Sequence, residues 1–318
     1  MATLTGAVQL ALLDSYTTVA GETKNSTTSS GVTIYTVDDH SVDNPGPPSA
    51  HPEGLHTGGV TTYEFIDNFT GSDYSVIASD VSRVFLNDAE GASVIVGDGN
   101  TYLNAARGDN KVIMGAGNNV IYTGDGNDVI RVGNGNNAFD TGAGSDIITV
   151  GNGNNTIVAG DGADVIRAGD GTNTIDTGAG ADSILVGNGN NLISAGAGND
   201  VIKVTSSSGS DNINADAGND TIYTGAGTHK INAGSGDDTV HLKAGAGVDT
   251  VIVGSGAGND TVSGFSAGDK VQAATGQSLL SSDSVIQDGS NTVVHFTDGS
   301  TVTLIGVNMA DLDVNSIS

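Results

Sequence analysis

A nine-residue period runs through the middle of this 318-residue chain and restricts its possible folds more than any other feature. Each unit has small residues at positions 2 and 4, a polar residue at position 6 and an aliphatic residue at position 8, as in Thr123-Gly-Asp-Gly-Asn-Asp-Val-Ile-Arg131. Two extra residues enter around 206–208, and eleven-residue steps then carry the pattern to Asp249 and Asp260. Repetition at a short fixed period is typical of solenoids, in which each repeat packs on the next.

The unit predicts a tight turn followed by a short β-strand. Glycine adopts positive φ without steric penalty, and the three residues after position 6 form a strand whose middle side chain points inward. With 49 Gly, no Cys, no Trp and 4% aromatic residues, the core must be thin and aliphatic. The inward positions are Ile130, Phe139, Ile148, Ile157, Ile166, Ile175, Ile184, Ile193 and Ile202.

The repeats resemble the calcium-binding nonapeptide repeats of RTX proteins, G-G-x-G-x-D-x-U-x, over residues 87–263. The first consensus glycine is usually replaced here by Thr, Val or Ala, whereas the glycines at positions 2 and 4 are kept in most units. Residues 258–269 resemble the element that closes such arrays. The resemblance implies an all-β fold, a right-handed parallel β-roll in which two nonapeptides form one turn and residues eighteen apart lie above one another.

The regions on either side of the repeats are also expected to be β-rich, which gives three segments: 1–86, the β-roll at 87–263, and a C-terminal β cap at 264–318. All four prolines lie within 44–54, which predicts a loop there. Residues 31–37 and 60–66 predict strands, and 293–307 predicts a hairpin with Asp298 and Gly299 at its turn.

The C-terminal segment resembles the uncleaved signal of proteins exported by type I secretion. The resemblance therefore implies a secreted bacterial protein, extracellular or at the cell surface, and an N-terminal leader is then not expected. No segment has the roughly 18 consecutive apolar residues of a membrane span, so membrane insertion is not expected.

The charge of the chain favours cations as partners. The net charge of −27, from 37 acidic and 10 basic residues, argues against nucleic acid or an anionic membrane as a partner. Two aspartates stacked at the strand spacing of about 4.8 Å repel by roughly 3 to 4 kcal/mol at an effective dielectric near 20. Calcium prefers hard oxygen ligands, and the chain has no Cys or clustered His suited to zinc. The alternative, that aspartate serves only as a turn former, does not explain why it recurs at one position.

Position 6 alternates strictly between Asn and Asp from Asn119 to Asp200, so the true period is eighteen. We predict a column of several calcium ions on one edge of the roll, the Asp edge, with carbonyl oxygens of its turn glycines as further ligands. On the other edge, the Asn edge, neutral amides are expected to stack into a hydrogen-bonded ladder. His229 on that edge is expected to be a tolerated turn residue rather than a ligand, and the roles of Asp211 and Asp249 stay open.

The Asp edge carries Asp128, Asp146, Asp164, Asp182, Asp200, Asp220, Asp238 and Asp260, with the glycines Gly124, Gly126, Gly142, Gly144, Gly160, Gly162, Gly178, Gly180, Gly196 and Gly198. The Asn edge carries Asn119, Asn137, Asn155, Asn173, Asn191, Asp211, His229 and Asp249.

An enzyme is not predicted. The chain has no H-E-x-x-H pair, no G-x-S-x-G elbow and no P-loop lysine, and its G-x-G-x-x sequences belong to the repeats. Position 7 lacks the flat threonine array of an ice-binding surface. The predicted function is a secreted, calcium-binding structural protein that folds on calcium and self-assembles into a homo-oligomer or polymer, as a surface-layer, matrix or filament subunit. The alternative is a calcium-dependent adhesin with residues 1–86 as its ligand-binding module.

Overall fold

The computed structural model describes residues 91–105, 107–205, 208–245, 247–254, 256–274, 284–312 and 317, together with six strands nearer the N-terminus. The described residues fall into two compact units, Met1–Asn152 and Gly153–Ser318. The predicted proline-rich loop at 44–54 lies outside the described residues. Almost all regular structure is β, and about ten solenoid turns occupy residues 94–273.

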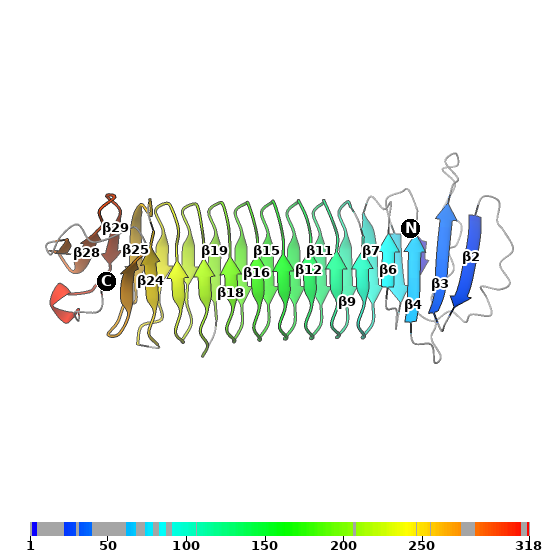
Figure 1. Cartoon of the computed structure of the whole chain (residues 1–318), viewed down its shortest axis with the longest axis horizontal. Helices are drawn as coiled ribbons and strands as arrows, with labels where there is room; N and C mark the ends of the chain where they lie inside the picture. Colours follow the sequence, from blue (N-terminus) through cyan, green and yellow to red (C-terminus); the bar gives the residue numbers. More distant parts are fainter. Residues whose placement is uncertain are drawn as a thin grey trace. The chain divides into compact units, whose positions relative to one another are not determined.

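The first unit consists of two sheets between which successive strands of the repeats alternate (Figure 1). Every neighbouring pair in it is parallel except β2 and β3, which form a hairpin. Sheet A has the order β1 (Ala2–Leu4), β5 (Tyr74–Ala78), β7 (Ala92–Val96), β9 (Lys111–Met114), β11 (Val129–Val132) and β13 (Ile147–Val150). Sheet B has the order β2 (Glu22–Ser29), β3 (Val32–Asp39), β4 (Thr62–Asp67), β6 (Arg83–Leu86), β8 (Tyr102–Asn104), β10 (Val120–Tyr122) and β12 (Ala138–Asp140).

The second unit has the same two-sheet construction. Its sheet A has the order β15 (Val165–Ala168), β17 (Ser183–Val186), β19 (Val201–Val204), β21 (Thr221–Tyr223), β23 (Thr239–His241), β25 (Asn259–Ser263), β29 (Thr301–Leu304), β28 (Asn291–His295) and β27 (Val285–Asp288). Its sheet B has the order β14 (Thr156–Val158), β16 (Thr174–Asp176), β18 (Leu192–Ser194), β20 (Asn212–Asn214), β22 (Lys230–Asn232), β24 (Thr250–Val253) and β26 (Lys270–Ala273). A short 3-10 helix, Met309–Asp311, follows β29.

Strand pairing confirms that one solenoid turn contains two nonapeptides. Val165 of β15 pairs with Ser183 of β17, eighteen residues later. The separation becomes twenty where the extra residues enter, as in Val201 with Thr221, and twenty-two between Thr239 and Thr261. The extra residues therefore lengthen turns without shifting the registry of the strands.

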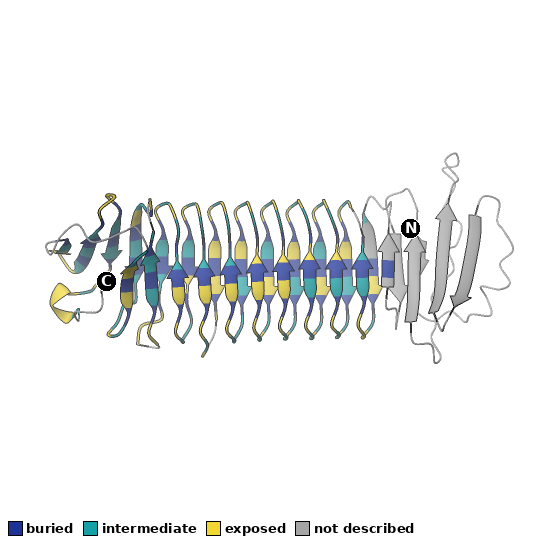
Figure 2. Cartoon of the chain, viewed as in Figure 1, coloured by how far each residue is buried: buried dark blue, intermediate teal, exposed yellow. Residues whose placement is uncertain are grey.

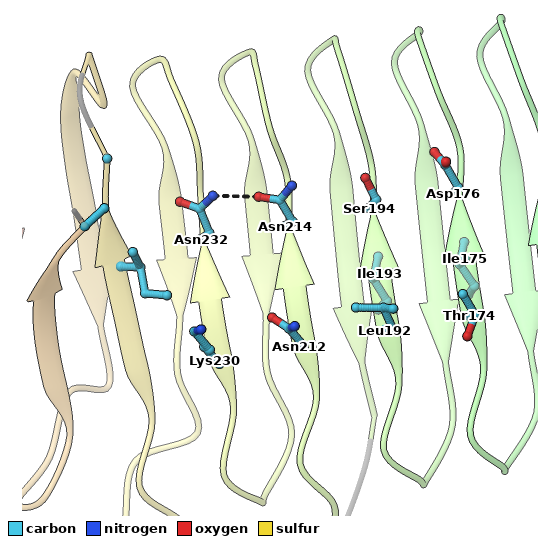
Figure 3. Close-up of a pocket in the computed structure, with 13 residues that line it drawn as sticks. Thr174, Ile175, Asp176, Leu192, Ile193, Ser194, Asn212, Asn214, Lys230 and Asn232 are labelled. Carbon is cyan, nitrogen blue, oxygen red and sulfur yellow. Dashed lines mark hydrogen bonds between the residues drawn. The ribbon is translucent and has the colours of Figure 1, made fainter. Parts of the chain in front are cut away.

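The core is the thin aliphatic layer that the sequence predicts. The position-8 side chains, such as Ile148 and Ile184, have relative exposures of 0–3%. Dark blue in Figure 2 marks the buried residues along the strands. The residues on either side of them point outward. Figure 3 shows this outer face of sheet B, where Asn214 and Asn232 are joined by a hydrogen bond of 2.6 Å from Nδ2 of Asn232 to Oδ1 of Asn214.

Two regions contain strands outside the repeats. The predicted strands at 31–37 and 60–66 are confirmed as β3 and β4, and β4, β5 and β6 pair in parallel within the two sheets despite lacking the nonapeptide pattern. The predicted C-terminal hairpin is confirmed as β28 and β29, with Asp298 and Gly299 between them. Sheet A continues into this hairpin because β29 pairs in parallel with β25.

The two edges have different turns, a difference that the sequence analysis does not predict. On the Asp edge, glycines at positions 2 and 4 both have positive φ, as at Gly196 (93°) and Gly198 (143°). On the Asn edge, in the turns from Asn119 to Asn191, only position 4 does, as at Gly189 (138°). Glycine is also needed for space, because a Cβ on Gly198 would collide with the carbonyl oxygen of Gly180 one turn earlier.

Candidate calcium-binding site

The position-6 side chains lie inside the turns, each with at most 3% exposure. Within each unit, Oδ1 of an Asp-edge aspartate accepts a hydrogen bond from the backbone N–H of the position-6 residue one turn earlier. Oδ1 of Asp182 accepts from Asp164 at 2.7 Å, and Oδ1 of Asp200 accepts from Asp182 at 2.7 Å. The same contact persists across the longer turns, to Asp220 and Asp260. Within each unit the predicted stacking of aspartates is therefore confirmed.

Burial of these aspartates separates the charge of the repeats into a negative interior and a nearly neutral exterior. Residues 91–274 contain 20 aspartates, no glutamate and 8 lysines or arginines. Eleven of the aspartates are buried in the two columns of position-6 residues and their continuation, whereas the nine others and all eight basic residues are exposed or partly exposed. The negative charge of this region is thus concentrated where solvent cannot screen it.

In three turns of the Asp edge the second carboxylate oxygen lacks a hydrogen-bond donor. Oδ2 of Asp200, Asp220 and Asp238 is buried and accepts no hydrogen bond. Burial raises the pKa of each of these three carboxyls to about 6, and that of Asp260 to about 8, with repulsion from neighbouring aspartates adding to the effect. A buried acceptor without a donor is costly, so this column fits a cation ligand set.

Asn110 shows which atoms surround that position. It begins the Asp edge column eighteen residues before Asp128, and its amide Nδ2 stands where the later turns have a carboxylate oxygen. Nδ2 donates to the carbonyl of Gly108 at 2.6 Å, the carbonyl of Thr123 at 3.1 Å and Oδ1 of Asp128 at 3.0 Å. Where an aspartate stands in place of this asparagine, the equivalents of these three oxygens face a carboxylate oxygen, which has no hydrogen to donate. A calcium ion would satisfy all of them, because it takes six to eight oxygen ligands.

By the equivalence of the repeats, the site after Asp220 would use Oδ2 of Asp220, Oδ1 of Asp238 and the carbonyls of Gly218 and Ala233. This set favours position-4 over position-2 glycines as ligands, because the position-2 carbonyls of Gly178 and Gly196 accept backbone hydrogen bonds from the following turn. No cluster of three or more His, Cys, Asp or Glu suited to a metal occurs among the described residues. Main-chain carbonyls would therefore complete each proposed site.

The Asn edge forms the predicted amide ladder. Nδ2 of Asn155 donates to Oδ1 of Asn173 at 2.9 Å, and Nδ2 of Asn173 donates to Oδ1 of Asn191 at 3.0 Å. Nδ2 of Asn155 also donates to the carbonyl of Gly153 at 3.0 Å, the position-4 glycine of its own turn. The amide hydrogens thus occupy the place that a cation would take on the Asp edge.

Sequence reasoning missed three participants in these columns. Asn110, eighteen residues before Asp128, and Asp269, twenty residues after Asp249, extend the two columns, and spacing alone could have identified both. The third is the threonine at position 1 of some Asp-edge turns. Burial raises the pKa of Asp182, whereas the hydroxyl of Thr177 lowers it, and nothing in the repeat consensus indicates that contact.

These features define a class of protein, a parallel β-solenoid whose turns enclose a column of buried carboxylates on one edge. The family model of the RTX calcium-binding nonapeptide repeat (4 copies) matches residues 95–129, 114–148, 149–184, 176–203 and 205–240. Residues 95–203 and 205–240 therefore match the RTX repeat, and their parallel β-solenoid fits an RTX β-roll. Such repeats bind calcium and are typical of secreted bacterial proteins.

Other comparisons add little. No curated protein matches the chain significantly. Among solved structures, the crystal structure of extracellular lipase LipA from Serratia marcescens matches with 17% identity and a TM-score of 0.31, covering 89% of this chain and 42% of that chain. This chain spans less than half the length of that protein, and so low a TM-score carries no argument about activity. No helix among the described residues is long and apolar enough to cross a membrane.

Proposed function

We propose that the chain is a secreted structural protein of the cell surface or extracellular matrix that folds on calcium and then self-assembles. The observation that carries the calcium dependence is the concentration of eleven aspartates inside the turns of a solenoid whose exterior is nearly neutral. The proposed ligands are the Asp-edge carboxylates and the turn carbonyls beside them.

The cost of the ion-free fold supports this dependence. Raising a carboxyl pKa from 3.8 to about 6, as at Asp220, costs about 3 kcal/mol at neutral pH. Three such carboxyls at Asp200, Asp220 and Asp238 bring the cost to the order of the whole stability of a typical domain. Extracellular calcium modules bind at about 10⁻⁴ to 10⁻³ M, so the chain would fold after export rather than in a calcium-poor cytosol.

The proposal of self-assembly has its support at the edge of sheet A. Among the described strands, β27 pairs with β28 alone, so one side of it has no strand partner there. Its residues after Val285 are exposed, including Ile286 at 48%. Exposed strand edges recruit other chains, and a contact from such an edge to another surface of an identical chain need not close into a ring.

Electron microscopy and sedimentation of the purified chain, with calcium in the millimolar range and with excess chelator, test both parts. We expect ordered sheets or fibres in calcium and dispersed, unfolded chains in chelator. Folded monomers at high protein concentration in calcium would overturn self-assembly and favour the adhesin. Equal β-sheet circular dichroism with and without chelator would overturn the calcium dependence.

A further inference from the structure

His229 interrupts the Asn edge in an acidic stretch. The amides of that edge end at Asn191, and Asp211, His229, Asp249 and Asp269 follow at successive turns. His229 has 1% exposure and the three aspartates have 2–3%. The earlier turns of this edge carry neutral amides, whereas this stretch carries three buried carboxylates in one column. Buried carboxylates need a source of positive charge.

The outer two carboxylates of this stretch have protein donors. Oδ1 of Asp211 accepts from both the backbone N–H and the side-chain Nδ2 of Asn191, each at 2.8 Å. Asp269 accepts from Asp249 N–H through Oδ1, and from the backbone N–H and hydroxyl of Ser266 through Oδ2. The deficit is therefore confined to the two turns on either side of His229.

The imidazole of His229 meets this deficit. Its Nδ1 lies 2.9 Å from Oδ2 of Asp211, both side chains being fully buried, at ion-pair distance although without the angles of a hydrogen bond. Its backbone N–H donates to Oδ1 of Asp249 at 2.9 Å. The other charged side chain close in sequence, Lys230, is exposed on the outer face of sheet B.

We propose that His229 is a built-in cation that takes the place of a calcium ion between Asp211 and Asp249, so that this part of the Asn edge binds a proton rather than a metal. The chain then uses two kinds of counter-ion: calcium on the Asp edge and a protonated imidazole on the Asn edge. His229 is the residue that excludes calcium from a column otherwise acidic enough to bind it. This inference goes beyond the proposed function, since it concerns the edge that is not assigned calcium.

The surroundings of the ring support the charged form. Burial opposes protonation, but the Asp211 carboxylate, the charge of Asp249 and the carbonyl of Gly225 together outweigh it, so the pKa of His229 is raised above 6.5. A group whose pKa is raised on folding contributes stability that is full below its unfolded pKa and lost as pH rises through its folded pKa. The pH dependence therefore has a definite sign, with stability falling as the pH rises above 6.5.

The first test is an NMR titration of the histidines of the full chain in saturating calcium, where the Asp edge is already neutralised. The His229→Asn variant identifies the resonance of His229 by its loss. We expect a pKa above 6.5, and stability to urea that falls between pH 6 and 8.5 in the wild type but not in His229→Asn. A pKa at or below 6.5 would overturn the proposal.

The second test counts bound calcium by equilibrium dialysis at pH 7. The His229→Asp variant should bind at least one more ion per chain than the wild type, because it turns the stretch into a column of aspartates. His241→Asn is the matched control, since His241 stacks on Tyr223 at 4.6 Å on the outer face of sheet A, and it should leave the count unchanged. An equal count in wild type and His229→Asp refutes the proposal. A wild type that binds no calcium contradicts the proposed function instead.

Discussion

Replacing Asp238 by asparagine should stabilise the ion-free protein and destabilise the calcium-bound one. Burial raises the pKa of Asp238 from 3.8 to about 6. Each pKa unit is worth about 1.4 kcal/mol, so the ionised side chain costs the ion-free fold about 3 kcal/mol at pH 7.5. Asparagine removes this charge and keeps the oxygen that accepts from Asp220 N–H at 2.8 Å. Its amide would also find acceptors equivalent to those of Asn173 on the other edge, where Nδ2 donates to a position-4 glycine carbonyl and to the position-6 side chain of the next turn.

The neighbouring Asp237 provides a control with the same change of charge. It is exposed, and its Oδ1 accepts from the backbone N–H of Asn259 at 2.8 Å, which an asparagine can also do. In excess chelator, Asp238→Asn should raise the free energy of unfolding by about 3 kcal/mol, and Asp237→Asn by much less. In saturating calcium the order should reverse, because Asp238→Asn loses a ligand charge.

Circular dichroism during urea unfolding measures these differences. If the wild type is unfolded in chelator at pH 7.5, lowering the pH supplies the comparison. The raised carboxyl pKa values mean that ion-free stability is full below about pH 4 and lost as pH rises through about 6. The wild type should therefore gain β structure as the pH falls, and Asp238→Asn should gain it at a higher pH. Equal effects of the two substitutions in chelator would refute the reasoning.

Two further predictions concern the turns. Asp164→Ala should raise the calcium concentration at the folding midpoint, because a ligand oxygen is lost. Asn155→Ala should instead lower stability by about 1 to 3 kcal/mol at every calcium concentration. Calcium titrations followed by circular dichroism distinguish the two variants, and equal shifts in the midpoint contradict the asymmetry of the edges. Gly196→Ala should destabilise by at least about 1 to 2 kcal/mol, because φ is 93° and a Cβ would collide with the Gly178 carbonyl, whereas Gly254→Ala, where the added Cβ meets nothing within 4 Å, should be nearly neutral in thermal melts.

The sequence predicts most of the fold because the same apolar pattern recurs in every repeat, so each repeat indicates the same strand register. An error of one residue at Ile148 or Ile184 would turn the entire apolar row toward solvent. The alternation of Asn and Asp likewise indicates two chemically different edges before any geometry is known. Strands β4, β5 and β6 could not be placed in the same two sheets, because each carries only a generic β pattern and no repeat fixes its partner.

The details of the site were harder to predict because they depend on which acceptors meet in space. The nonapeptide pattern treats glycines at positions 2 and 4 alike, yet the backbone hydrogen bonds distinguish the carbonyl of Gly196 from that of Gly198. The role of His229 depends on Asp211 one turn earlier. The inserted residues make the spacing twenty between Asn191 and Asp211, and again between His229 and Asp249. A sequence pattern records the residue types but not the direction in which each polar atom points.

The interior hydrogen bonds give the solenoid a polarity. Most position-6 N–H groups donate to a side chain of the turn that follows, as Asp182 does to Asp200. Cutting away later turns would leave a buried N–H without an acceptor, at a cost of about 1 to 3 kcal/mol. Cutting away earlier turns would leave a carboxylate oxygen, which water or an ion can satisfy. At the end of the Asn edge, where no later side chain follows in the column among the described residues, the N–H of Asp269 is satisfied locally. It donates to the carbonyl of Ser266 at 3.1 Å. A shortened solenoid should thus tolerate the loss of its first turns far better than the loss of its last.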